Sequence, residues 1–209
     1  MAKRLSKSRY TAFCQCPKNL WLKVYRPEEA IIDPGLEARF EQGNIIGDLA
    51  MQLFGEFKEV TTKNPDGSLD LSTMCKLTQQ YIADGIDNIC EASFSNDNNY
   101  CAVDILRRNQ DGWDIYEVKS SSYSDLDGKV SNIEIYAPDI AYQKWLLTKC
   151  GIKVINTYLV CLNRDYVRHG DLDIKKLFVI VDMRTLVENE YLKVPAQCLQ
   201  ALKILSTED

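Results

Sequence analysis

Apolar residues recur at helical spacing along the first part of the chain. Residues 6–24, 33–54 and 71–90 each carry an apolar residue at about every third or fourth position, which predicts three helices. Pro17 lies inside the first of these segments, so we expect a break or bend there. Turn-forming residues over 61–69 separate the second helix from the third. The chain is therefore expected to begin with helices.

The pattern changes in the middle of the chain. Residues 99–107 and 113–120 read as apolar strands on either side of a turn that contains Asp111-Gly112, and Asp-Gly is a strong hairpin signal. The remaining pattern predicts a helix over 136–150, strands over 153–162 and 176–182, and a last helical stretch over 184–205 that is interrupted at Pro195. We expect an α/β fold, in which a central mixed sheet with an antiparallel hairpin is flanked by helices and preceded by a helical segment.

Composition and length place the chain among ordinary globular proteins. Of its 209 residues, 45% are hydrophobic and 26% are charged, which excludes collagen-like and disordered classes. A chain of this length buries enough surface to form a core without disulfide bonds. We expect one domain over residues 1–209, with a mainly helical part at 1–95 and an α/β core at 96–209.

The cysteines and the apolar runs indicate the compartment. The eight cysteines accompany a basic start that is not followed by the apolar segment of a signal peptide, so we expect free thiols in a reducing cytoplasm. No apolar run approaches the roughly 18 residues that span a bilayer, so no membrane segment is expected.

Charge is unevenly distributed along the chain. The formal net charge is −5, yet the first 26 residues hold seven basic residues and no acidic one, so the remainder is strongly acidic. One interpretation is a solvated basic helix. The other is a phosphate-facing surface in which Lys7, Arg9 and Lys18 bind nucleic acid. Nucleic acid is thus allowed as a partner but not required, and protein partners are left open.

Several familiar chemistries are excluded by the residue inventory. His169 is the only histidine and lies in a polar segment, where we expect a solvated surface residue. The chain has no Gly-x-Ser-x-Gly sequence, no phosphate-binding loop and no Cys-x-x-Cys pair. A histidine-based metal site and a serine or cysteine triad are therefore not expected.

The predicted hairpin carries three charged residues in apolar surroundings: Asp104, Glu117 and Lys119. Residues directly opposite each other in an antiparallel pair share one face of the sheet. A two-residue loop at Asp111-Gly112 would place Asp104 opposite Lys119, and a four-residue loop over 109–112 would place it opposite Glu117. Either loop gathers the three charges, whereas a three-residue loop would send Asp104 to the other face. Both faces are otherwise apolar, which predicts a central, covered hairpin.

Two carboxylates that are buried close together repel each other and need a cation between them. Lys119 supplies one positive charge, and a divalent metal would supply the rest. Carboxylates, a backbone carbonyl, water and phosphate oxygens form the oxygen-rich shell that Mg²⁺ prefers. The alternative is an Asp–Glu–Lys ion-pair cluster without a metal.

At this point the sequence resembles a known family. Asp104 followed by Glu117-Val118-Lys119 is similar to the core motif of the PD-(D/E)xK nucleases. The surrounding sequence narrows the resemblance to the RecB-like branch, close to an uncharacterised bacterial family related to the CRISPR-associated RecB-like exonucleases. The segments that carry this resemblance are 5–9, 16–22, 39–50 and 139–143, and together they cover nearly the whole chain.

The resemblance implies a restriction-endonuclease-like core and phosphodiester hydrolysis that depends on Mg²⁺ or Mn²⁺. It implies that Asp104, Glu117 and the backbone carbonyl of Val118 bind the metal. It also implies that Lys119 positions or helps to deprotonate the attacking water and stabilises charge in the transition state. Gln143 matches the family glutamine that contacts water or phosphate near the metal.

The sequence departs from the family in its first helix and in its glutamine motif. Many RecB-like nucleases have a metal-binding histidine four residues after a glycine, but Gly43 is followed here by Gly47. Glu41 or Asp48 of the same helix could approach the metal instead, and the alternative for each is a plain surface carboxylate. The glutamine motif commonly ends in tyrosine four residues later, where this chain has a leucine at position 147.

The resemblance also raises the question of a 4Fe-4S cluster. In the related exonucleases one cysteine of the Cys-Pro segment joins three C-terminal cysteines, which would make Cys16 a ligand. Only Cys198 lies near the end of this chain. Either there is no cluster, or the chain is the N-terminal portion of a longer protein that supplies the other ligands, and the second alternative is preferred. The remaining cysteines are expected to be small core residues.

The sequence therefore leads to two hypotheses. The first is a metal-dependent nuclease that hydrolyses phosphodiester bonds, of the DNA exonuclease type. The second, motivated by the absent histidine, is a catalytically inactive nuclease-like module for nucleic-acid binding or assembly.

Overall fold

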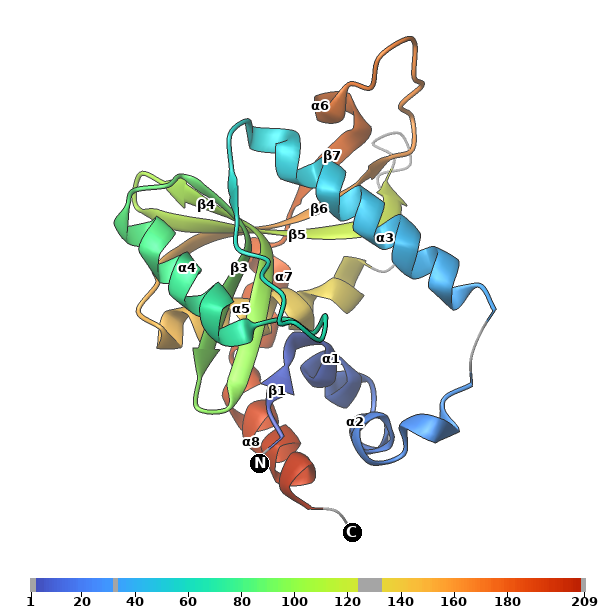
Figure 1. Cartoon of the computed structure of the whole chain (residues 1–209), viewed down its shortest axis with the longest axis vertical. Coiled ribbons are helices and arrows are strands. Elements are labelled where there is room, and N and C mark those ends of the chain that lie inside the picture. The colour runs from blue at the N-terminus through green and yellow to red at the C-terminus, as the bar shows by residue number, and fades with distance from the viewer. Residues whose placement is uncertain (1–2, 32–33, 124–132, 208–209) are drawn as a thin grey trace.

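The structure is a computed structural model that describes residues 3–31, 34–123 and 133–207. Its centre is a mixed sheet of seven strands (Figure 1). Along the sheet the order is β2 (Lys58–Glu59), β3 (Asn88–Asn96), β4 (Asn99–Asn109), β5 (Gly112–Tyr123), β6 (Val154–Asn163) and β7 (Phe178–Asp182). The short strand β1 (Leu5–Ser6) pairs with β4 outside this order. The predicted α/β class with a central mixed sheet is confirmed.

Strand direction divides the sheet into antiparallel and parallel pairs. The β3–β4, β4–β5 and β6–β7 pairs are antiparallel, whereas β1–β4, β2–β3 and β5–β6 are parallel. The parallel β5–β6 pair is connected through helix α5 (Ala137–Lys149), as a parallel crossover requires. Strands β4 and β5 are central, so the predicted covered hairpin is confirmed.

Helices cover both faces of the sheet. On one face, α3 (Leu36–Ala50), η2 (Met51–Phe54) and α6 (Ile174–Leu177) pack on a core cluster that contains Ile105 and Tyr116. The other face packs against α5 and a larger core cluster that contains Leu106 and Ile115. The helices that contribute to this larger cluster are α1 (Lys7–Gln15), α2 (Pro17–Tyr25), α4 (Leu71–Ala83), α5, α7 (Arg184–Tyr191) and α8 (Val194–Ser206). In Figure 1, α3 crosses in front of the sheet and its first turns extend beyond it.

The helix breaks fall where proline predicts them. The N-terminal helical segment divides into α1 and α2, and Pro17 is the first residue of α2. Ser6 caps α1, because its hydroxyl accepts a hydrogen bond from the backbone N–H of Arg9. The C-terminal helical stretch divides into α7 and α8, with Pro195 in the first turn of α8. Short 3₁₀ helices occupy Pro27–Glu29 (η1) and Ile133–Tyr136 (η3).

The helix predicted over 71–90 is wrong at its end. Helix α4 stops at Ala83, and Gly85 adopts a φ of +78°, which turns the chain out of the helix. Strand β3 then begins at Asn88 and runs beside β4, to which it is joined by a tight turn at Asp97-Asn98. Both turn residues have positive φ, as a type I′ hairpin turn requires. Strands β1, β2 and β3 place the part before residue 96 in the sheet as well.

The register of the β4–β5 hairpin decides where its charged side chains lie. Asn109 pairs with Gly112 and Ile105 pairs with Tyr116, so the turn consists of Gln110 and Asp111. The register is the one predicted for the four-residue loop over 109–112, and Asn109 and Gly112 form one further pair at the turn. The alternative prediction, a two-residue turn at Asp111-Gly112, is wrong. Extended by one residue, the register places Asp104 opposite Glu117.

Gly112 has a different role from the one that its Asp-Gly sequence suggests. Its φ is not in the left-handed region, and it lies in β5 beside the carbonyl of Lys153. A Cβ atom at this position would approach that carbonyl oxygen to 2.4 Å. The glycine is therefore required for close packing of β5 against the start of β6.

No helix in the described part of the chain is both long enough and apolar enough to cross a membrane.

Candidate active site

The candidate site lies where the two strands of the hairpin part. Strands β4 and β5 pair from the turn back to Ile105 and Tyr116, and then β4 stays with β3 while β5 continues beside β6 (Figure 1). At the point of divergence the N–H of Val118 donates to the Asp104 carboxylate at 2.7 Å instead of to a strand carbonyl. The pairing of β5 with β6 also shifts register between Val118 and Ser122. Irregular pairing of this kind is frequent beside active sites.

Glu117 is the centre of the polar contacts. Its side chain is 1% exposed, and its two carboxylate oxygens accept hydrogen bonds from three residues on three different elements. Lys7 Nζ lies 3.1 and 3.0 Å from the two oxygens, Lys119 Nζ lies 2.5 Å from Oε1, and Gln143 Nε2 lies 2.7 Å from Oε2. Three of the predicted residues, Glu117, Lys119 and Gln143, are thus in direct contact.

Asp104 joins this group through Lys7, whose Nζ lies 3.4 Å from Asp104 Oδ1. The same ammonium therefore contacts both carboxylates of the hairpin. The proximity of Asp104, Glu117 and Lys119 that the register predicted is present in the structure.

Sequence reasoning missed Asp139. Its carboxylate is buried on α5, 3.1 Å from Lys119 Nζ and 3.2 Å from Gln143 Nε2. Asp139 and Gln143 are four residues apart, so one helix face presents both to the hairpin. This four-residue spacing was the feature of the sequence that could have identified Asp139 as a site residue. Asp139 and Glu117 together hold the Lys119 ammonium in one position.

Burial and charge shift the pKa values of these groups in opposite directions. Burial, followed by repulsion from Glu117, raises the pKa of Asp104 to about 6. Burial alone would raise the pKa of Glu117 too, but the ammonium groups of Lys119 and Lys7 lower it well below its usual range. Burial opposes the charge of both lysines, yet the surrounding carboxylates raise their pKa values above the ordinary range. The site therefore holds two ammonium groups and an ionised Glu117.

A further carboxylate, Glu91 on β3, faces the same region. The β3–β4 register places it opposite Asp104, and burial, followed by the charge of Asp104, raises its pKa to about 7. Its backbone has a φ of +56°, which is unusual for a residue with a side chain. The sequence prediction missed Glu91, because residues 71–90 were expected to be helical and the strand was not recognised.

Most of these side chains, but not Asp139 or Gln143, line a cavity of about 750 Å³ that residues of α3 also line. From the sheet and from α1, the residues that line it include Lys7, Glu59, Glu91, Asp104, Glu117, Val118 and Lys119. Helix α3 contributes Gly43, Gly47 and Asp48 to the opposite wall, and a Cβ atom on either glycine would meet nothing within 4 Å. Glu41 is exposed and is not among the lining residues, so of the two α3 carboxylates that the sequence suggested, Asp48 is the one at the cavity.

Asp104 and Glu117 are the side chains of this site that could bind a small divalent cation. Asp104 and Glu117 supply carboxylate oxygens, which Mg²⁺ and Mn²⁺ prefer, and Mg²⁺ commonly takes only one or two carboxylates from a protein. Gln143 Oε1 is buried without a hydrogen-bond partner, an unusual state for an amide oxygen. In the part of the chain that the structure describes, no three His, Cys, Asp or Glu side chains are placed to hold a metal between them. Water and substrate oxygens would have to complete the shell.

The basic residues of the N-terminal segment have different surroundings. Lys7 points into the carboxylate group, whereas Arg9 donates to the carbonyl of Arg4 at 2.6 Å and Lys18 is exposed on α2. Lys7 therefore belongs to the candidate site, and contact of Arg9 and Lys18 with nucleic acid stays a prediction.

None of the eight cysteines lines the cavity of the candidate site. All eight are free, with Cys16 exposed at the start of α2 and Cys198 buried in α8. Within the described residues no group of three cysteines gathers around a common point, so these residues do not fit a 4Fe-4S cluster. His169, the lone histidine, is exposed in the loop before α6, as predicted.

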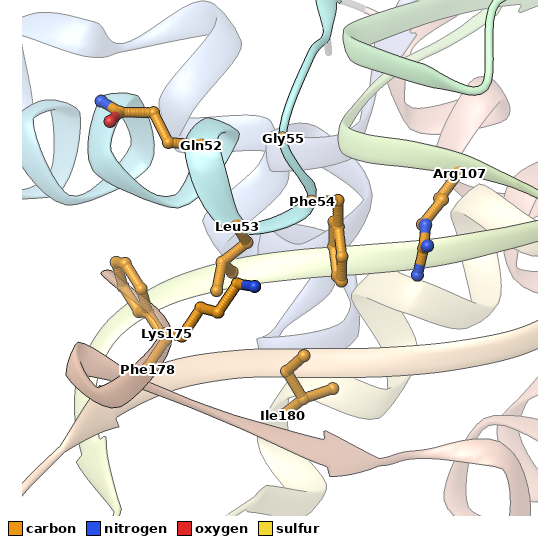
Figure 2. Close-up of a pocket in the computed structure, with 8 residues that line it drawn as sticks. All are labelled: Gln52, Leu53, Phe54, Gly55, Arg107, Lys175, Phe178 and Ile180. Carbon is orange, nitrogen blue, oxygen red and sulfur yellow. The ribbon is translucent and has the colours of Figure 1, made fainter. Parts of the chain in front are cut away.

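A second hollow of about 550 Å³ lies over the face of the sheet that carries η2 and α6 (Figure 2). Arg107 lies 4.5 Å from the centre of the Phe54 ring, and Lys175, Phe178 and Ile180 complete the surroundings. None of the lining residues contributes to the carboxylate group, so this hollow is distinct from the candidate site.

Neither comparison with known proteins places the chain in a family: no known family model matches it, and no curated protein matches it.

Proposed function

We propose that the chain is a Mg²⁺- or Mn²⁺-dependent nuclease with a restriction-endonuclease-like core, which hydrolyses phosphodiester bonds of nucleic acid, DNA in the first place. The proposal rests on one observation. Asp104 and Glu117 both contact the ammonium group of Lys7, beside Lys119, in a cavity large enough for a phosphodiester group. A bound metal would polarise a phosphoryl oxygen and make water a better nucleophile.

The residues of the chain divide the remaining tasks. Asp104 and Glu117 would hold the metal, with the Val118 carbonyl as the predicted third ligand. Lys119 retains its proton, because the neighbouring carboxylates raise its pKa. We therefore assign Lys119 to stabilising charge on the phosphoryl group rather than to removing a proton from water. Gln143 fixes Glu117 through its Nε2 group, and its unpaired Oε1 is an acceptor for a water proton.

The experiment is a cleavage assay of the purified chain on labelled single-stranded DNA, double-stranded DNA and RNA, with Mg²⁺, Mn²⁺ or a chelator. Lys119→Met should reduce the metal-dependent rate by about 100-fold or more, the usual effect of removing one charge-stabilising group. Asp104→Asn should abolish it. Lys149→Met is the matched control, because Lys149 is exposed on α5. Cleavage that survives in Lys119→Met and Asp104→Asn would overturn the assignment.

One observation favours the inactive binding module as a second candidate. The ammonium groups of Lys7 and Lys119 already balance the charges of Asp104 and Glu117, so these residues form an ion-pair cluster without a metal. This alternative predicts salt-sensitive DNA binding that persists in Asp104→Asn and Glu117→Gln, with no heat of Mn²⁺ binding in calorimetry.

A further inference from the structure

The backbone around Lys7 is held rigidly against the core. Strand β1 pairs with β4, and the Leu5 carbonyl accepts a hydrogen bond from the Tyr142 hydroxyl at 2.7 Å. The Tyr142 ring in turn stacks on Tyr10 of α1, with 4.6 Å between the ring centres. Leu5, Tyr10 and Tyr142 are all fully buried. Lys7 follows directly after this anchored strand, so the fold fixes the point from which its side chain enters the site.

The ammonium of Lys7 lies at the position that a bridging cation would take. Its Nζ is nearly equidistant from the two oxygens of Glu117, at 3.1 and 3.0 Å, and is 3.4 Å from Asp104 Oδ1. These are the same two carboxylates that would hold the metal. A metal ion and the ammonium cannot both make these contacts, because they need the same oxygens and repel each other.

A second acceptor for the ammonium lies in the same cavity. Glu91 faces Asp104 across the β3–β4 pair and lines the cavity with Lys7. Its carboxylate forms no hydrogen bond or ion pair with any residue that the structure describes. A lysine side chain is long and flexible, and that of Lys7 is 23% exposed, so the protein does not enclose it on all sides.

We propose that Lys7 is an internal counter-ion of the site: its ammonium bridges Asp104 and Glu117 in the metal-free protein, and a divalent metal displaces it toward Glu91. The inference rests on the proposed metal centre and adds a residue that sets its affinity. After displacement, the ammonium remains in the cavity beside the metal, where it attracts a phosphate group of the substrate. The N-terminal Leu-Ser-Lys-Ser sequence thereby acquires a role in the site rather than on an external surface.

The consequence is a measurable competition. With Lys7 present, metal binding must break the contacts of its ammonium and leave two cations close together. Removing the charge should therefore tighten Mn²⁺ binding by about 10-fold or more, the reverse of what loss of a ligand would do. The same change should destabilise the metal-free protein, because the two carboxylates lose their shared cation.

The experiment is calorimetric titration of the full chain with Mn²⁺ at pH 8, for wild type, Lys7→Met and Lys23→Met. Lys23 is an exposed lysine of α2 and serves as the matched control. We expect tighter binding only in Lys7→Met. We also expect its thermal unfolding temperature to be below that of wild type without metal and to rise more when Mn²⁺ is added. Equal or weaker binding in Lys7→Met would overturn the inference.

The outcomes separate this inference from the proposed function. If wild type and Lys7→Met bind Mn²⁺ equally well, the inference about Lys7 is rejected and the proposed metal centre stands. If neither binds it, the metal centre and the role of Lys7 both fail.

A measurement on wild type does not depend on how the variant folds. After reductive ¹³C-methylation of the lysines, the NMR signal of Lys7, assigned with Lys7→Arg, should shift on addition of Mg²⁺ while that of Lys23 stays in place. A Lys7 signal unmoved by saturating Mg²⁺ would also overturn the inference.

Discussion

The carboxylate of Asp104 takes the place of a strand carbonyl, because it accepts the backbone N–H of Val118 at 2.7 Å where β4 and β5 diverge. An N–H left without an acceptor inside a sheet costs free energy. Asp104 therefore closes the end of the hairpin and, in the proposed function, also binds the metal.

Two substitutions distinguish the structural role of Asp104 at the end of the hairpin from its role in binding the metal. Asp104→Asn keeps an oxygen that accepts the Val118 N–H and removes a buried charge, so the free energy of unfolding of the metal-free protein at pH 8 should not fall. Asp104→Ala leaves that N–H without a partner and should cost about 1–3 kcal/mol. Both should lose Mn²⁺ binding. Urea unfolding measures the change in unfolding free energy, and calorimetry measures Mn²⁺ binding. Equal unfolding free energies for Asp104→Asn and Asp104→Ala would contradict the structural role of Asp104.

Glu91 should make stability depend on pH. Its pKa is raised from 4.5 to about 7, by burial first and then by Asp104, so the folded protein binds this proton more tightly than the unfolded chain. Such a group favours the folded state at low pH, and this contribution is lost as the pH rises from about 4.5 to 7. Between pH 5 and pH 8, wild type should therefore lose about 2 kcal/mol more unfolding free energy than Glu91→Gln.

Urea unfolding of the metal-free protein at the two pH values checks this expectation. The raised pKa of Asp104 acts in the same direction but is present in both proteins, so it largely cancels in the comparison. Glu37→Gln, at an exposed position of α3, should follow the wild-type profile. Parallel profiles for Glu91→Gln and wild type would show that Glu91 titrates normally.

Gly112 should tolerate no side chain. An added Cβ would lie 2.4 Å from the Lys153 carbonyl oxygen, which is backbone and cannot move without disturbing the β5–β6 pair. Gly112→Ala should lower the unfolding free energy by about 1–3 kcal/mol, the usual cost of overpacking. Gly43→Ala is the contrasting control: it meets open space within α3 and should stabilise the helix by about 0.5–1 kcal/mol. If Gly112→Ala is as stable as wild type, the backbone at the start of β6 can move away from the added methyl group without cost.

The hairpin site was predictable because strand geometry allows few alternatives. Side chains alternate between two faces, so any even loop gathers Asp104, Glu117 and Lys119. The loop residues could not be fixed, because Asp111-Gly112 favours a turn in its own right. In the fold, Gly112 instead lies in β5, where it allows the Lys153 backbone to come close. The turn consists of Gln110 and Asp111, one residue earlier in the chain.

The parts of the site that escaped prediction depend on contacts between distant segments. Lys7 and Glu117 are 110 positions apart, and nothing local to Lys7 distinguishes it from a surface lysine. Glu91 was hidden because the apolar pattern of α4 continues into β3, and only Gly85 marks the boundary. Strands of two residues, such as β1 and β2, are too short to show a period.

Position 47 offers a gain-of-function test of the metal centre. Gly47 lies on the cavity wall of α3, and a side chain there meets open space. The sequence resemblance implies that this is the position of a metal-binding histidine in many RecB-like nucleases. Gly47→His should therefore add a ligand and tighten Mn²⁺ binding by about 10-fold at pH 8, where imidazole is neutral. Ile45→His, on an exposed position of the same helix, should bind Mn²⁺ as wild type does. Calorimetry compares the three proteins. If Gly47→His binds the ion no better than Ile45→His, α3 does not face the metal that Asp104 and Glu117 would hold, and a donor for the open side of the site must be sought elsewhere.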